Sequence, residues 1–271
     1  MSEQAENRID RRFAKLRGEG RKALVTYIVA GDGGIENTVP LMHQLVSSGS
    51  DLIELGVPFS DPMAEGQVIQ KGHERALAHK TSLRRCLELV AEFRRDDSET
   101  PVILMGYANP IERMGGEAFA DAAQAAGVDG ALTVDLPAEE AGELSGLLAE
   151  RNLRNIFLLT PTTSEERIRA ITELASGFIY YVSLKGVTGA GNLDPESVRE
   201  NLERIRKHTE LPLCVGFGIK DGASARAVSA AGDGAVVGSV LVSAVGEAND
   251  GLEARDRVAG LVAEIRGALD R

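Results

Sequence analysis

The chain has 271 residues, which is enough for one large domain or two small ones with a substantial buried core. Asp and Glu number 41 against 30 Lys and Arg, so the net charge is -11 at pH 7. An acidic protein is repelled by polyanions, which argues against a sequence-independent hold on nucleic acid or on an anionic membrane surface. We therefore expect no nucleic acid and no membrane among its partners.

The two cysteines and four histidines form no metal-binding pattern. Cys86 and Cys214 lie far apart in the sequence and no histidine clusters with them, so we expect no metal site. The N-terminal segment is charged throughout and lacks the apolar core of a signal peptide. No run approaches the roughly 18 apolar residues of a membrane-spanning helix. The sequence thus predicts a soluble, cytoplasmic protein with reduced cysteines.

The first predicted element is an amphipathic helix over residues 9–16. Ile9, Phe13 and Leu16 would lie on one side of this helix. The alternative is a frayed tail that packs against nothing. If the rest of the chain forms a barrel, we expect the helix to cover the N-terminal mouth of that barrel.

Short β-branched runs then alternate with segments of helical spacing along the whole chain. Strands that are apolar on both faces and alternate with helices indicate parallel strands covered on the outside. The pattern predicts a (β/α)₈ TIM barrel with an extra N-terminal helix, in one domain over residues 1–271. A doubly wound sheet also alternates, but regular units without a break in composition favour closure. The predicted strands are residues 24–29, 52–57, 102–107, 131–136, 155–160, 178–184, 212–217 and 234–238.

A carboxylate interrupts the second predicted strand. Side chains alternate along a strand, so Leu52 and Glu54 share one face while Ile53 and Leu55 share the other. If Ile53 and Leu55 pack against helices, Glu54 points into the barrel near the C-terminal rim, where active sites of this fold lie. Burial there would raise the pKa of Glu54 toward the range useful for proton transfer. The alternative is a structural glutamate paired with a buried Lys or Arg.

A second carboxylate, Glu65, follows in a loop that Pro58 and Pro62 restrict and that Asp61 can hold in a turn. Two carboxyl groups, one buried and one on a stiff loop, can divide the acid and base roles of a reaction. The alternative for Glu65 is an ordinary solvated side chain.

Glycine-rich loops follow the sixth, seventh and eighth predicted strands. Glycine lets backbone N–H groups approach an anion closely, and Ser239 precedes a short predicted helix over residues 240–245. Barrels commonly bind phosphate at this position, although each loop alone is typical of an ordinary turn. The spacing of Gly216, Gly218 and Gly222 misses the dinucleotide fingerprint, and no acidic ribose-binding residue follows the next strand, which excludes NAD.

Aromatic residues are scarce, and several tyrosines fall at strand ends. Tyr27, Tyr107 and Tyr180 lie at or near the ends of the first, third and sixth predicted strands, and Asn109 follows closely. These residues could line a flat apolar pocket with polar edges, as an aromatic substrate requires. Packing in the core is the alternative for each tyrosine.

Taken together, these motifs resemble the tryptophan synthase alpha subunit family over nearly the whole chain. The first motif below is highly specific, and the others gain weight from their order. The resemblance is carried by ELGVPFSDPMAEG (54–66), GYAN (106–109), YYVSLKGVTGA (180–190), GFGI (216–219) and the GS pair 238–239.

The resemblance implies a lyase that cleaves indole-3-glycerol phosphate to indole and glyceraldehyde 3-phosphate without a cofactor in this chain. It implies that Glu54 takes the proton from the hydroxyl beside the indole ring and helps to protonate the ring carbon. Glu65 would hold the indole N–H and stabilise the positive charge that develops on the ring. The remaining implied substrate contacts are Tyr27, Tyr107, Asn109, Tyr180 and Thr188, with the phosphate on Gly189, Phe217, Gly218, Gly238 and Ser239.

The same resemblance implies a beta subunit as partner, in an α₂β₂ heterotetramer. Pro58 and Asp61 would face this partner, whose pyridoxal phosphate site receives the indole. The chain departs from the family at Glu65, where aspartate is usual; the extra methylene moves the charge by about 1.5 Å. This replacement favours one alternative, a catalytically weakened subunit kept for binding and regulation. Another alternative is a lyase that works without a partner.

Overall fold

The computed structural model describes residues 6–183, 195–216 and 218–271. In this part of the chain, parallel strands close into a barrel in sequence order, with β8 hydrogen-bonded to β1. The predicted (β/α)₈ barrel is therefore confirmed, and every predicted run overlaps a strand. The strands are β1 (Ala23–Val29), β2 (Leu52–Gly56), β3 (Val102–Gly106), β4 (Gly130–Thr133), β5 (Arg154–Leu159), β6 (Ile179–Val182), β7 (Leu213–Gly216) and β8 (Gly234–Val237).

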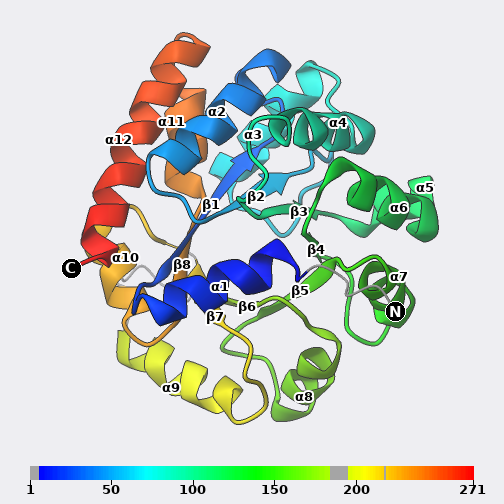
Figure 1. The fold of residues 1–271 in the computed structure, drawn as a ribbon, viewed down its shortest axis with the longest axis vertical. Helices are drawn as coiled ribbons and strands as arrows, with labels where there is room; N and C mark the ends of the chain where they lie inside the picture. The colour runs from blue at the N-terminus through cyan, green and yellow to red at the C-terminus, as the bar shows by residue number, and fades with distance from the viewer. Residues whose placement is uncertain (1–5, 184–194, 217) are drawn as a thin grey trace.

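Helices form a layer around the barrel, as Figure 1 shows. Their boundaries follow capping residues in several cases; the Ser82 and Asp250 side chains, for example, accept from backbone N–H groups in the first turns of α4 and α12. The described helices are α1 (Arg8–Gly18), α2 (Ile35–Ser47), α3 (Gln67–Ala78), α4 (Leu83–Phe93), α5 (Ala108–Met114), α6 (Gly116–Ala126), α7 (Gly142–Glu150), α8 (Glu165–Leu174), α9 (Pro195–Arg206), α10 (Gly222–Ser229), α11 (Ser239–Gly246) and α12 (Gly251–Leu269).

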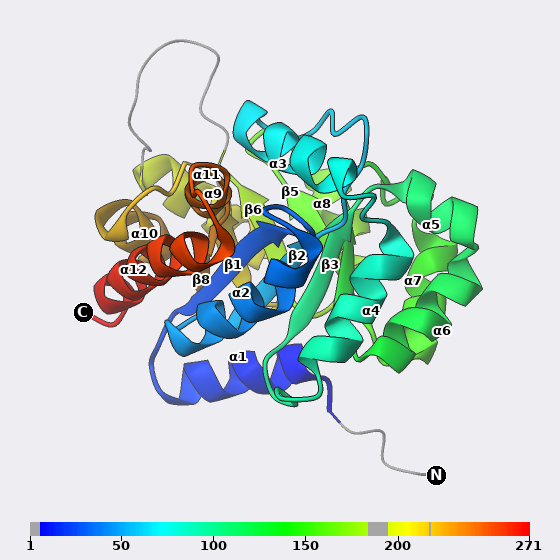
Figure 2. The ribbon, with the colours of Figure 1, turned by 90° about the horizontal axis from the view of Figure 1, so that it is seen from above.

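Helix α1 covers the N-terminal mouth of the barrel, as predicted. Figure 2 shows it at the opposite end of the barrel from α3. Its apolar residues Ile9, Phe13 and Leu16 are buried and pack with barrel-interior residues, and the Phe13 and Phe178 ring centroids are 5.6 Å apart. Asn7 caps the helix by accepting from the Ile9 N–H at 2.8 Å. The mouth is thus closed by a core layer, which leaves the other end of the barrel for a site.

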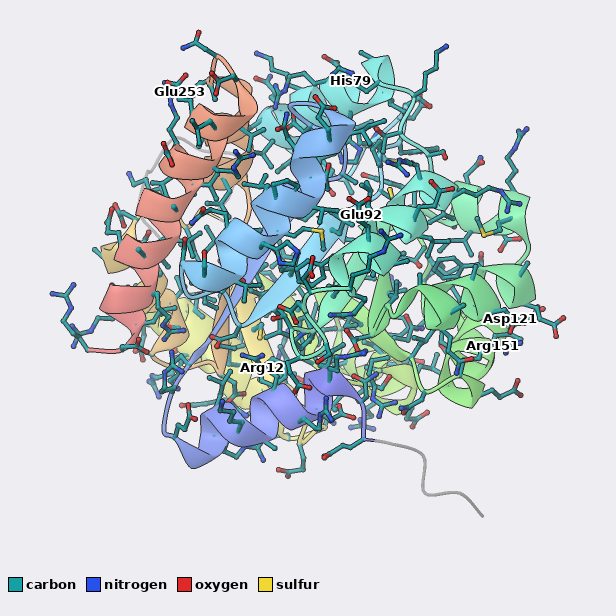
Figure 3. The ribbon with its side chains drawn as sticks, turned by 45° about the horizontal axis from the view of Figure 1, so that its top comes forward. Arg12, His79, Glu92, Asp121, Arg151 and Glu253 are labelled. Atoms are coloured by element: carbon teal, nitrogen blue, oxygen red, sulfur yellow. The ribbon has the colours of Figure 1, made fainter. Side chains whose placement is uncertain are left out.

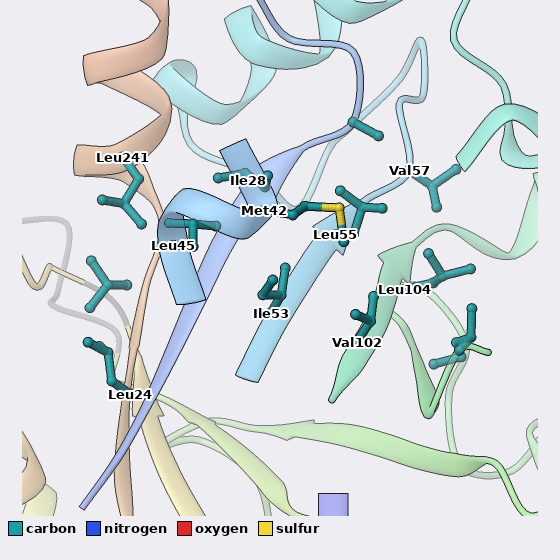
Figure 4. Packing of buried hydrophobic residues seen from close by; sticks show 14 of the residues in the cluster. Leu24, Ile28, Met42, Leu45, Ile53, Leu55, Val57, Val102, Leu104 and Leu241 are labelled. Carbon is teal, nitrogen blue, oxygen red and sulfur yellow. The ribbon is translucent and has the colours of Figure 1, made fainter. Parts of the chain in front are cut away.

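Side chains alternate between the barrel interior and the layer under the helices. Ile53 and Leu55 of β2 pack outward, and Figure 4 shows them with Met42 and Leu45 of α2. Leu52, on the opposite face, belongs to the interior cluster. Glu54 shares that face by the period of the strand, so it points into the barrel as predicted.

Charged groups occupy the outer helix faces and a few buried positions. In Figure 3 Asp121 and Arg151 lie side by side, where the Arg151 guanidinium donates to the Asp121 carboxylate and joins α6 to the end of α7. Asp129 is buried and accepts from the Val102 N–H at 2.8 Å and from Arg94 Nη2 at 2.7 Å. These bonds tie α4 to the barrel between β3 and β4.

No helix in the described ranges is long and apolar enough to cross a membrane.

Candidate active site

A cavity of about 450 Å³ opens at the C-terminal ends of the strands, within the size range of small-molecule sites. Its surface is mainly apolar, with two carboxyl groups and a few hydroxyl groups. Among the described residues it is lined by Tyr27, Glu54, Ala64, Glu65, Gly66, Gln67, Val68, Ile69, Met105, Val134, Leu158, Thr160, Tyr180, Val182, Gly218, Ile219, Val236, Gly238 and Ser239.

Glu54 lies at the bottom of this cavity on β2 and is fully buried. Neither of its carboxyl oxygens has a hydrogen-bond partner among the described residues, so no Lys or Arg there neutralises it. Burial, reinforced by the charge of Glu65, raises the pKa of Glu54 to about 8. The group therefore carries its proton at neutral pH and can donate it to a bound molecule.

Glu65 lies on the loop between β2 and α3 and lines the same cavity. The loop holds its backbone firmly: the Glu65 N–H donates to the Pro62 carbonyl at 3.1 Å, and the Glu65 carbonyl accepts from Gln70 Nε2 at 2.8 Å. Burial raises the pKa of the Glu65 carboxyl to about 7. Glu65 is therefore half-buried and not an ordinary solvated side chain. At a pKa near 7, its protonated and ionised forms are both populated at neutral pH.

Two of the predicted tyrosines line the cavity. Tyr27 on β1 is the cross-strand neighbour of Glu54, and Tyr180 comes from β6 on the other side of the barrel. Each ring crosses the end of a neighbouring strand at a glycine. A Cβ at Gly56 of β2 would lie 2.4 Å from Tyr27 Oη, and a Cβ at Gly216 of β7 would lie 2.3 Å from Tyr180 Oη, so neither position has room for a side chain. The glycines at these strand ends therefore make room for the aromatic part of the cavity.

Tyr107 and Asn109 are not among the lining residues of the cavity. The strand β3 ends at Gly106, and Tyr107 stacks on Phe59 with ring centroids 4.9 Å apart. Its hydroxyl accepts from the Ala64 N–H at 3.2 Å, so Tyr107 supports the loop that carries Glu65. Asn109 lies on α5 and is exposed.

One end of the cavity is built from backbone suited to an anion. Gly218 has a φ of 73°, in the left-handed region that favours glycine. Gly238 and Ser239 form the start of α11, so the N-terminal end of this helix borders the cavity. Three predicted contacts, Thr188, Gly189 and Phe217, lie outside the described residues.

The loop after β2 also contains both residues predicted to face a partner. Pro58 is buried and Asp61 is exposed, with Ser60 Oγ donating to Asp61 Oδ2 at 2.6 Å. Met63, in the same loop, is 80% exposed, and Val68 is 38% exposed at the start of α3. This rim of the cavity therefore combines a carboxylate with uncovered apolar side chains.

The predicted site omitted the apolar lining of the cavity and one polar side chain. Met105, Val134, Leu158 and Val236 line the cavity, and each lies on or just beyond the inward face of its strand. The two-residue period of the strands was the signal for these positions. His73, which contacts Tyr27 from α3, had no signal in the sequence, because its role depends on how α3 packs against β1.

The fold and the cavity define a (β/α)₈-barrel enzyme that has two proton-exchanging carboxyl groups in an apolar site with an anion-binding end.

Comparison with known proteins narrows this class to one family. The family model described as tryptophan synthase alpha chain matches residues 13–267. The alpha chain of Thioalkalivibrio sulfidiphilus is 58% identical over 97% of this chain and 100% of its own length, and that of Nitrosococcus oceani is 56% identical over 97% and 98%. The chain belongs to the tryptophan synthase alpha chain family.

Solved structures agree with this assignment. The crystal structure of tryptophan synthase subunit alpha from Legionella pneumophila superposes with a TM-score of 0.92 at 45% identity, covering 98% of this chain and 99% of that one. A structure of Mycobacterium tuberculosis tryptophan synthase gives a TM-score of 0.87 at 33% identity, covering 97% and 98%. The similarity extends over nearly the full length in each case.

Proposed function

We propose that this chain cleaves indole-3-glycerol phosphate to indole and glyceraldehyde 3-phosphate, with Glu54 and Glu65 as its acid–base pair. The observation that carries the proposal is the pair of carboxyl groups in one cavity, whose pKa values burial raises to about 8 and about 7. Family membership supports the reaction. The chemistry of the reaction explains why the two groups need different environments.

Breaking the bond between the indole ring and the glycerol chain requires a proton on ring carbon C3, so that the ring can accept the bonding electrons. Glu54, protonated at neutral pH, donates this proton. The ring then carries positive charge at its nitrogen, and ionised Glu65 accepts a hydrogen bond from the indole N–H and stabilises that charge. Glu65 can ionise because Glu54 is still neutral when the substrate binds.

In the second step the Glu54 carboxylate removes the proton from the hydroxyl next to the ring. The C–C bond breaks, the hydroxyl carbon becomes the aldehyde of glyceraldehyde 3-phosphate, and the bonding electrons return to the ring to give indole. Glu54 takes up the hydroxyl proton in place of the one that stays on C3 of indole, so the cycle consumes no net proton. A carboxyl group with a pKa of about 8 suits both directions of transfer.

The two ends of the cavity support the same orientation of the substrate. Met105, Val134 and Leu158 provide apolar surface for the indole ring. The phosphate would lie at the backbone of Gly218, Gly238 and Ser239, together with Gly189 and Phe217. Tyr27 and Tyr180 would flank the ring, and Thr188 would complete these contacts. Tyr107, which does not line the cavity, would act on the substrate through the loop that carries Glu65, with exposed Asn109 two residues further along the chain.

We propose further that the chain works with a tryptophan synthase beta subunit in an α₂β₂ heterotetramer in the cytoplasm. The exposed Asp61 and Met63 beside buried Pro58 support a protein-binding surface at the rim of the cavity. No cofactor would be held in this chain, and pyridoxal phosphate would belong to the beta subunit. Residues 1–271 would form one domain.

The test is indole release from indole-3-glycerol phosphate by the purified chain, alone and with a beta subunit. Slow release that rises sharply with the partner and disappears in Glu54→Gln is expected. Substrate binding without release in either condition would instead favour a regulatory binding subunit. Full release without the partner would favour a lyase that works alone.

A further inference from the structure

His73 lies outside the cavity lining but touches two parts of the site. It belongs to α3 and is 2% exposed. Its Nδ1 accepts from the backbone N–H of Phe59 at 3.0 Å, and its Nε2 lies 3.2 Å from Tyr27 Oη. One imidazole thus joins the loop after β2 to the aromatic part of the cavity.

The direction of both hydrogen bonds follows from the Phe59 backbone. An N–H group can only donate, so Nδ1 of His73 must be an unprotonated acceptor. The proton of a neutral imidazole is then on Nε2, which donates to Tyr27 Oη. Burial lowers the pKa of His73 to about 4 and keeps the ring neutral under physiological conditions. The two nitrogens therefore have different and fixed tasks.

The loop joined to His73 carries Glu65. Its first part is held at Phe59, by the N–H bond to His73 and by the stacking of the Phe59 ring on Tyr107. Its last part is held at Ala64 by the Tyr107 hydroxyl and at Glu65 by the side chain of Gln70. Removing the His73 bond would leave Phe59 held by its stacking on Tyr107, the ring whose hydroxyl accepts from the Ala64 N–H next to Glu65, so a shift of Phe59 would reach Glu65 through Tyr107.

We propose that His73 is a positioning residue for the cleavage reaction: through Nδ1 it fixes the loop at Phe59 and thereby the place of the Glu65 carboxyl over the substrate. This inference rests on the role that the proposed function gives to Glu65. Precise placement matters because a shift of about 1 Å in a reacting group can lower a rate by about a hundredfold. The Nε2 bond to Tyr27 orients the imidazole so that Nδ1 faces the loop.

Two polar replacements of His73 distinguish the role of Nδ1 from that of Nε2. In His73→Asn the side-chain oxygen takes the place of Nδ1 and can still accept from Phe59, while in His73→Gln the terminal amide reaches toward Tyr27 and the acceptor for Phe59 is lost. We expect His73→Asn to stay within about threefold of the original kcat. We expect His73→Gln to lose about 10 to 100-fold in kcat, with KM for indole-3-glycerol phosphate changed less than about threefold.

A double-mutant cycle that combines His73→Gln with Glu65→Gln distinguishes a positioning role of His73 from general support of the fold. Indole release is measured with the full chain and a beta subunit present, for His73→Gln, Glu65→Gln and the double variant. If His73 acts through Glu65, His73→Gln lowers kcat by less than about threefold in the Glu65→Gln background. An equal loss in both backgrounds, or equal kcat for His73→Asn and His73→Gln, would overturn the inference while leaving Glu65 essential. Full activity of Glu65→Gln would overturn the proposed function, and the inference with it.

Discussion

Replacing Glu54 by Gln should make the protein more stable while removing its activity. The carboxyl is fully buried and has no hydrogen-bond partner among the described residues. Its pKa is raised from 4.5 to about 8, so the folded protein retains a proton that the unfolded chain releases above pH 4.5. The free energy of unfolding therefore falls with rising pH between these two values.

The size of the effect follows from the pKa difference. Each unit of pKa difference is worth about 1.4 kcal/mol. Burial of Glu54 therefore lowers the free energy of unfolding by roughly 3 kcal/mol at pH 7 and by roughly 5 kcal/mol above pH 8. Gln has nearly the same shape and no charge, so Glu54→Gln avoids this penalty. The gain should nearly vanish at pH 4.5, where the unfolded chain also holds its proton about half the time.

Urea unfolding of both proteins at pH 4.5, 7 and 9 measures this difference, and Glu173→Gln on the exposed side of α8 is the matched control. The control should leave the free energy of unfolding unchanged at each pH. Indole release should drop at least about 10³-fold in Glu54→Gln, because the variant cannot transfer a proton. Parallel stability curves for Glu54→Gln and the original chain would show that Glu54 is ionised and solvated in the folded protein, and would refute the reasoning.

Three further changes test other parts of the structure. Glu65→Asp should keep turnover within about tenfold, since the charge moves by only one methylene; an inactive variant would mean that the loop is built around the longer acid. Gly56→Ala should lower kcat/KM at least about tenfold, because its Cβ would lie 2.4 Å from Tyr27 Oη, and unchanged kinetics would contradict this close approach. Asp129→Ala should cost about 1 to 3 kcal/mol in thermal or urea unfolding, because the buried Val102 N–H loses its acceptor and Arg94 loses one of its carboxylate partners, with kcat per folded molecule unchanged. A loss below about 0.5 kcal/mol would show that water replaces the carboxylate.

The inward direction of Glu54 could be predicted from the sequence because it depends only on local geometry. In a closed barrel covered on the outside by helices, an Ile53 and Leu55 face that packs outward leaves the Glu54 face pointing inward. The same two-residue period fixes the apolar lining at the ends of the other strands. The N-terminal helix was predictable for a similar reason, since Ile9, Phe13 and Leu16 require an apolar partner surface.

The tertiary structure alone decided the environment of Glu65 and the separate tasks of the tyrosines. A glutamate in a loop is solvated by default, whereas Glu65 is half-buried in a loop that Tyr107, far away in sequence, and His73, from the following helix, hold at Ala64 and Phe59. Tyr27 and Tyr107 both fall at strand ends in the sequence. Tyr27 lies within the hydrogen-bonded ladder and lines the cavity, whereas the chain leaves β3 before Tyr107 and turns it toward the loop. The place where a strand ends depends on pairing across the closed barrel, which no local pattern specifies.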